Sequence, residues 1–179
     1  FAPFAFRTGA FAPAAGLEDS TAAQDTLFLE RTAPRDVLRN TAGGDGRDAA
    51  SIIYAGERVF AAISFTGGKV GDSAVLGEQQ ALVGGGSGLV YRDADSKVVG
   101  SGSVSQGGRG AGAACGAHNL TLSAAPELTV DGTKLVTTGA LDIDSATEWG
   151  VEAGGNWKSL YAQAGTFDYA VKPRTIPDL

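Results

Sequence analysis

Apolar and small or polar residues alternate along much of this chain, in paired runs joined by very short turns. In AASIIYAGERVFAAISF, two such runs flank residues 55–57. The stretch GSGLVYRDADSKVVGSGSV has the same pattern of two runs, here flanking residues 93–96. In TEWGVEAGGNWKSLYAQAGTFDYAV, two runs flank residues 154–156. Successive side chains of a strand point to opposite faces, so this alternation predicts strands, and the short Gly-, Asp- and Asn-containing turns predict antiparallel hairpins.

We therefore expect an all-β antiparallel fold. It has about seven strands, at 3–11, 47–55, 58–66, 78–92, 97–105, 146–154 and 157–171. No stretch has a convincing helical pattern, since APRDVLRN offers two helical turns at most. Long polar connections at about 12–46, 67–77 and 106–145 separate the hairpins. Such segregation of long loops from tight turns is typical of transmembrane β-barrels, whereas the loops of a soluble sandwich are usually short at both ends.

The two faces of the expected strands differ. Trp149, Val151 and Ala153 alternate with Gly150 and Glu152, which predicts an apolar outward face and a polar inward face. On the first strand Arg7 falls on the small-residue face, where a residue lining a lumen belongs. Aromatic residues gather near the expected strand ends, as residues of a membrane-interface girdle do: Tyr54, Tyr91, Trp149, Trp157, Phe167 and Tyr169.

Composition narrows the possible functions. The 179 residues suffice for one domain, and the net charge of −6 disfavours a general nucleic-acid binder. Cys115 is the only cysteine and His118 the only histidine, so we expect no disulfide, no metal site and no cofactor. No apolar run is long enough for a membrane helix. Because the chain opens on FAPFAF without Met, we expect a mature or internal piece of something longer.

Three segments resemble the phosphate-selective porin O/P family of outer-membrane proteins. They are GAFAPAAGLEDSTAAQDTLFLERTAPRDVLRNTAGGDGR, YAGERVFAAISFTGGKVGD and DSATEWGVEAGGNWKSLYAQAGTFDY. The resemblance implies a sixteen-stranded antiparallel barrel in the bacterial outer membrane, assembled as a homotrimer. The chain 1–179 would then be a single barrel segment, surrounded by outer-membrane lipid and passing small anions such as phosphate, or other small polar solutes. Seven strands cannot close such a barrel alone, because an open sheet edge is not tolerated in lipid.

The resemblance also implies that the segment 12–46 is the constriction loop that folds into the lumen. Its apolar triplet at 27–29 would anchor it against the wall. Arginine suits an anion filter because it stays charged and donates forked hydrogen bonds. Acidic neighbours weaken that positive potential, so a general diffusion channel stays open as an alternative to a phosphate filter. The candidate pore residues are Arg7, Glu18, Asp19, Arg31 and Arg35.

Two other classes of function compete with a porin. A secreted or surface-exposed β-rich binding module without channel activity would explain the glycine content and the acidity equally well. A hydrolase could use paired acids such as Asp142 and Asp144, but LDIDS is expected to be a solvated loop. We therefore expect no enzymatic activity, and solubility without detergent would distinguish the binding module from the porin.

Overall fold

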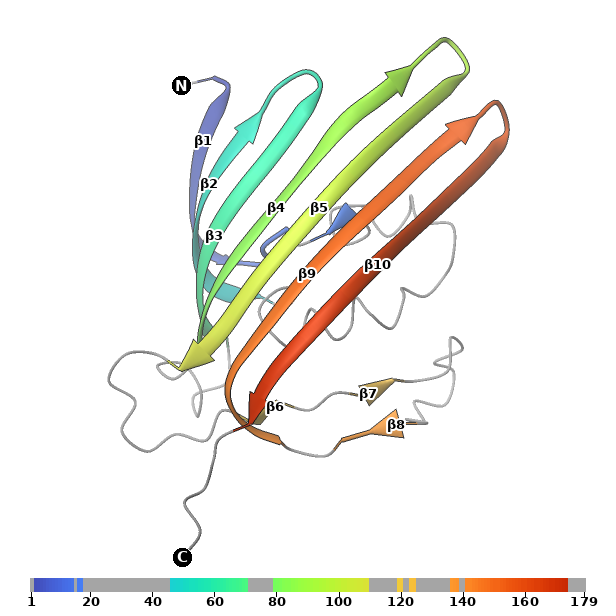
Figure 1. The fold of residues 1–179 in the computed structure, drawn as a ribbon. Coiled ribbons are helices and arrows are strands. Elements are labelled where there is room, and N and C mark those ends of the chain that lie inside the picture. Colours follow the sequence, from blue (N-terminus) through green and yellow to red (C-terminus); the bar gives the residue numbers. More distant parts are fainter. Residues whose placement is uncertain are drawn as a thin grey trace, which may run out of the picture.

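The computed structural model describes residues 2–14, 16–17, 46–70, 79–109, 119–120, 123–124, 136–138 and 141–173. It confirms the all-β antiparallel fold (Figure 1). One open sheet holds seven strands in the order β1 (Phe4–Phe11), β2 (Arg47–Ala55), β3 (Val59–Lys69), β4 (Gln79–Arg92), β5 (Ser96–Arg109), β9 (Leu141–Trp157) and β10 (Leu160–Pro173). Each strand is antiparallel to the next in this order.

Three shorter strands lie outside this order. β6 (Asn119–Leu120) pairs with the beginning of β9, while β7 (Ser123–Ala124) and β8 (Val136–Thr137) form a separate two-stranded sheet. No helix in the described part of the chain is long and apolar enough to cross a membrane. The LDIDS stretch was expected to be a solvated loop, which is wrong: it begins β9, where it pairs with β6 and then with β10.

Two of the three predicted hairpin turns lie where the sequence placed them. β2 ends at Ala55 and β3 begins at Val59, while β4 ends at Arg92 and β5 begins at Ser96. All three hairpin turns lie at the same end of the sheet (Figure 1). The second and third turns are joined there, because the Lys158 backbone N–H donates to the Asp95 carbonyl oxygen at 2.8 Å.

The third turn was predicted at 154–156, which is wrong. These residues belong to β9, and the turn lies at Lys158-Ser159, where Lys158 has a φ of 53°. Short hairpin turns need such left-handed residues, so glycine-rich sequence is the usual signal for them. Glycine is needed at Gly155 for a different reason. A Cβ there would collide with the Lys97 carbonyl oxygen of the neighbouring strand.

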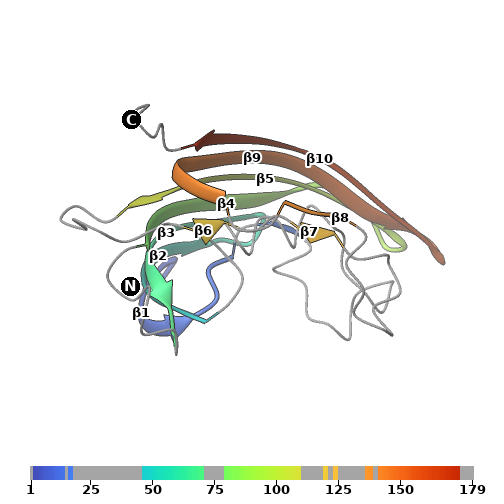
Figure 2. The ribbon, with the colours of Figure 1, turned by 90° about the horizontal axis from the view of Figure 1, so that it is seen from below.

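The sheet is strongly curved (Figure 2). Its two faces differ in the exposure of their side chains. Directly paired residues share a face, so burial alternates along the strands, as in β2, whose buried residues include Arg47, Ala49 and Ser51. We call the face that carries these residues the polar face. The opposite face, here called the apolar face, carries large exposed hydrophobic side chains from all seven strands: Phe4, Phe6, Ile52, Val59, Ile63, Phe65, Leu82, Val90, Val98, Val104, Trp149, Val151, Trp157 and Leu160.

Candidate functional site

One row of paired residues crosses the polar face from β1 to β10. Arg7 pairs with Ser51, and the row then continues through Ser64, Val83, Ser105, Glu148 and Tyr169. The Ser51 and Ser64 hydroxyls hydrogen-bond to each other at 2.6 Å. Thr66 lies beside this row, fully buried, and its hydroxyl donates to the Ala81 carbonyl oxygen at 3.5 Å. Hydroxyl and charged groups thus replace the hydrocarbon side chains expected in a packed core.

Glu148 is the most deeply buried charged residue described on this face, with 1% of its surface exposed. Ser103 donates to its Oε1 at 3.1 Å, and Ser105 donates to its Oε2 at 3.0 Å. A buried carboxylate is costly unless it is hydrogen-bonded, and bonds to a charged acceptor are stronger than neutral ones. The two serines on β5 therefore hold one carboxylate of β9 in a fixed place.

We expect Ser103→Ala and Ser105→Ala each to lower the free energy of unfolding by about 1.5–3 kcal/mol, because each removes a donor from a buried charge. Urea titration followed by tryptophan fluorescence measures this change. Ser101→Ala is the matched control on the same strand and face, since its only described acceptor lies 3.5 Å away. Equal effects of all three substitutions would contradict the special role of the two serines around Glu148.

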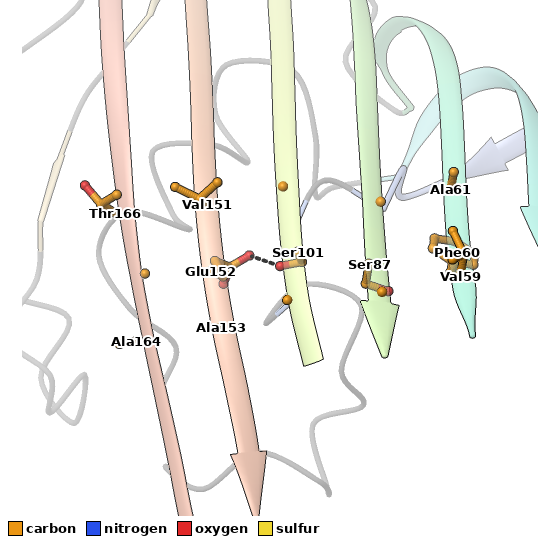
Figure 3. A pocket seen from close by; sticks show the side chains of 15 residues that line it. Val59, Phe60, Ala61, Ser87, Ser101, Val151, Glu152, Ala153, Ala164 and Thr166 are labelled. Carbon is orange, nitrogen blue, oxygen red and sulfur yellow. Dashed lines mark hydrogen bonds between the residues drawn. The ribbon is translucent and has the colours of Figure 1, made fainter. Parts of the chain in front are cut away.

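Glu152 lies four residues further along β9 on the same face. Its Oε2 accepts the Leu17 backbone N–H at 2.6 Å. The same oxygen accepts the Ser101 hydroxyl at 3.5 Å (Figure 3). Leu17 therefore reaches β9 from a segment that follows β1. Phe11 and Pro13, which precede it, are both buried.

Two arginines lie near the other side of the polar face. The Arg7 guanidinium stacks over the Phe11 ring at 4.1 Å from its centroid, and its side chain is largely exposed. Arg47 is buried, and its Nη1 donates to the Gly67 carbonyl oxygen at 3.4 Å. The described polar face thus has cations on β1 and β2 and carboxylates on β9, with hydroxyl groups of β3 and β5 between them.

Of the predicted pore residues, the structure describes Arg7 alone. The predicted small-residue face of its strand is the polar face, since Arg7 pairs with Ser51. The other four, Glu18, Asp19, Arg31 and Arg35, lie outside the described residues, as do the apolar triplet at 27–29, Cys115 and His118. The beginning of the proposed constriction segment 12–46 lies on the concave side of the sheet (Figure 2).

Glu148, Ser103 and Ser105 were not among the predicted site residues. Their signal was present in the alternation S-V-S of β5 and in E-W-G-V-E of β9, which places each of them on the face opposite Val104 and Trp149. The prediction that Phe167 and Tyr169 are girdle residues is wrong. They pair with Gly150 and Glu148 and are half-buried on the polar face, because their position in β10 fixes their direction.

The apolar face is hollowed over its middle strands. Val59 and Ala61 flank one side of this groove, and Val151 and Ala153 flank the other (Figure 3). Its floor is made of glycines of β4 and β5, namely Gly86, Gly88, Gly100 and Gly102. Because glycine has no side chain to stand above the sheet, the groove forms although the strands beneath it stay paired.

Comparison of the chain with protein-family models, curated proteins and solved structures gave no match. Within the described residues, no group of three or more histidine, cysteine or acidic side chains is arranged to hold a metal ion. The site is therefore characterised by its own geometry: a row of hydroxyl, guanidinium and carboxylate groups on one face of a curved sheet.

Proposed function

We propose that this chain is part of the wall of a porin in the bacterial outer membrane. Its apolar face contacts lipid, and its polar face lines a water-filled channel for passive diffusion of small anions such as phosphate, or of other small polar solutes. It catalyses no reaction. Further strands complete the barrel, and three copies associate as a homotrimer.

The observation that carries this proposal is the extent of the apolar face. On this face, the side chains nearest the hairpin turns are apolar or small. They remain so along stretches such as Leu82–Val90 and Trp149–Trp157. A tilted membrane-spanning strand needs about nine to eleven residues, which matches these stretches. Polar side chains follow them on the same face: Asp48, Gln106, Thr147 and Asp168.

Aromatic side chains lie at the two ends of these apolar stretches, where the membrane–water interfaces would be. Trp157 lies beside the third hairpin turn, and Trp149 lies where the polar residues of β9 begin; both are more than half exposed. Near the first turn, Phe4 and Tyr54 form an edge-to-face pair at 5.2 Å on the apolar face. Tryptophan and tyrosine prefer the two membrane–water interfaces, where the ring is apolar and its polar group stays hydrated.

Partition of the protein tests this proposal directly. We expect it to require detergent for solubility and to form ion-conducting channels in planar lipid bilayers. The secreted binding module, which is the competing function, would stay in solution without detergent and conduct no ions. An apolar face as large as this one is rarely left in water by a soluble monomer, which favours the membrane protein.

The proposed pore residues predict opposite changes in ion selectivity. Arg31→Ala should lower the anion-to-cation permeability ratio, and Asp19→Lys should raise it, because each changes the fixed charge near the permeating ion. Reversal potentials in a salt gradient across a planar bilayer measure this ratio. Asp168→Asn is the control, since it removes a charge from the apolar face. Unchanged selectivity in both pore variants would exclude this segment from the filter.

A further inference from the structure

The structure assigns Glu152 the role of a positioning residue for the segment that follows β1. We propose that its carboxylate fixes the described residues 12–14, 16 and 17, here called the strap, across the polar face of the sheet. The effect of this strap on ion flow rests on the proposed channel function, whereas the attachment itself does not. Glu152 is 8% exposed and lies on β9, five strands away from β1 in the sheet.

The contacts at the end of the strap are close and specific. The Leu17 N–H donates to Glu152 Oε2 at 2.6 Å, a short bond to a charged acceptor. A Cβ at Gly16 would lie 2.9 Å from the same oxygen, so glycine lets the backbone approach the carboxylate. The Leu17 side chain lies over Gly154, where an added Cβ would be 3.4 Å from its Cδ2. The chain thus meets β9 through a hydrogen bond and an apolar contact.

The strap crosses the strands between β1 and β9. Ala14, Gly16 and Leu17 enclose a small cavity together with residues of β3, β4 and β5, namely Phe60, Gly85, Gly86, Ser87, Ser101 and Gly102. At its beginning, Pro13 is fully buried. Both ends of the strap are therefore held against the sheet.

The length of the strap limits the path that it can take. The chain from Phe11 to Leu17 can reach about 20 Å when extended. Five strand spacings, measured along the sheet from β1 to β9, are about 24 Å. Only the curvature of the sheet, which shortens the direct path, allows the strap to connect the two strands (Figure 2). At β9 the bond from Leu17 to Glu152, together with the contact of the Leu17 side chain over Gly154, holds the end of the strap.

Hydrogen exchange of the Leu17 amide tests the attachment in the folded protein in detergent. Glu152→Ala should raise its exchange rate about ten- to hundredfold, which is the effect of losing a hydrogen bond to a charged group. Glu152→Gln retains an acceptor oxygen and should restore most of the protection. Glu148→Gln is the matched control: it alters the other buried carboxylate of β9 and should leave Leu17 protected. Equal exchange in Glu152→Ala and Glu148→Gln would overturn the proposal.

Single-channel recordings test whether the strap narrows the channel. Glu152→Ala should raise the unitary conductance, while Asp168→Asn, which removes a charge from the apolar face, should leave it unchanged. Unchanged conductance together with lost Leu17 protection would overturn the role of the strap in ion flow. If the unmodified protein forms no channel, the proposed function fails, and the exchange rates still decide whether Glu152 holds the strap.

Discussion

Ala153→Arg is expected to destabilise the folded protein in lipid bilayers strongly. Ala153 lies midway between Trp149 and Trp157 on the apolar face, where the proposed bilayer is deepest. An arginine near the bilayer midplane of a β-barrel costs about 2–4 kcal/mol, which reduces the folding equilibrium constant by roughly thirty- to a thousandfold. A urea titration of the protein in vesicles, with the folded fraction measured by gel mobility without heating or by tryptophan fluorescence, should show this loss as a lower midpoint.

Thr147→Arg is the matched control, on the same strand and face but beyond Trp149. A charge near the membrane interface costs only about 0–1 kcal/mol, so this variant should fold almost normally. If the apolar face were in water, both positions would be exposed surface sites, and each substitution would change stability by about 0.5 kcal/mol or less. Equal, small effects would therefore contradict the membrane assignment and favour the binding module.

Gly155→Ala is expected to lower the free energy of unfolding by about 3 kcal/mol, a large effect for one methyl group. A Cβ at this position would overlap the Lys97 carbonyl oxygen and would lie 3.2 Å from the Val98 Cα. The obstacle is backbone in a paired strand, so relief requires β5 and β9 to separate locally. Urea unfolding monitored by circular dichroism measures the change.

Gly88→Ala provides the comparison for this prediction. Gly88 also lies within a strand, but nothing lies within 4 Å of a Cβ built there. We expect its substitution to be neutral or slightly stabilising, because alanine restricts the unfolded chain more than glycine does. Similar losses of stability in both variants would mean that glycine is needed for strand conformation in general and not for the close approach at Gly155.

Strand positions could be predicted from the sequence because the alternation is local. Six of the seven main strands begin and end within four residues of their predicted bounds, while β9 is longer than predicted at both ends. The predicted opposition of Trp149 and Val151 to Glu152 is confirmed. The third turn could not be predicted, because a glycine needed for a turn and a glycine needed for a close strand contact look alike in a sequence. At the actual turn, the residue with the left-handed conformation is Lys158 and not a glycine, so the sequence carries no glycine signal there.

The candidate site was harder to predict because it depends on register. That Ser103 and Ser105 meet the two oxygens of Glu148 requires β5 to pair with β9, across an interval of more than thirty residues. No local pattern specifies that pairing. The hydrogen bond from Leu17 to Glu152 joins residues still further apart, and nothing in the sequence GLE indicates which strand it contacts.

The order of strands limits how this sheet can be completed. Every neighbouring pair from β1 to β10 is antiparallel, so β1 and β10, which are separated by an even number of reversals, run in the same direction. Joining these two edges directly would create a parallel seam. A cylinder with antiparallel pairing throughout therefore needs an odd number of additional strands between β10 and β1, which makes its total even, as in bacterial outer-membrane barrels formed by one chain.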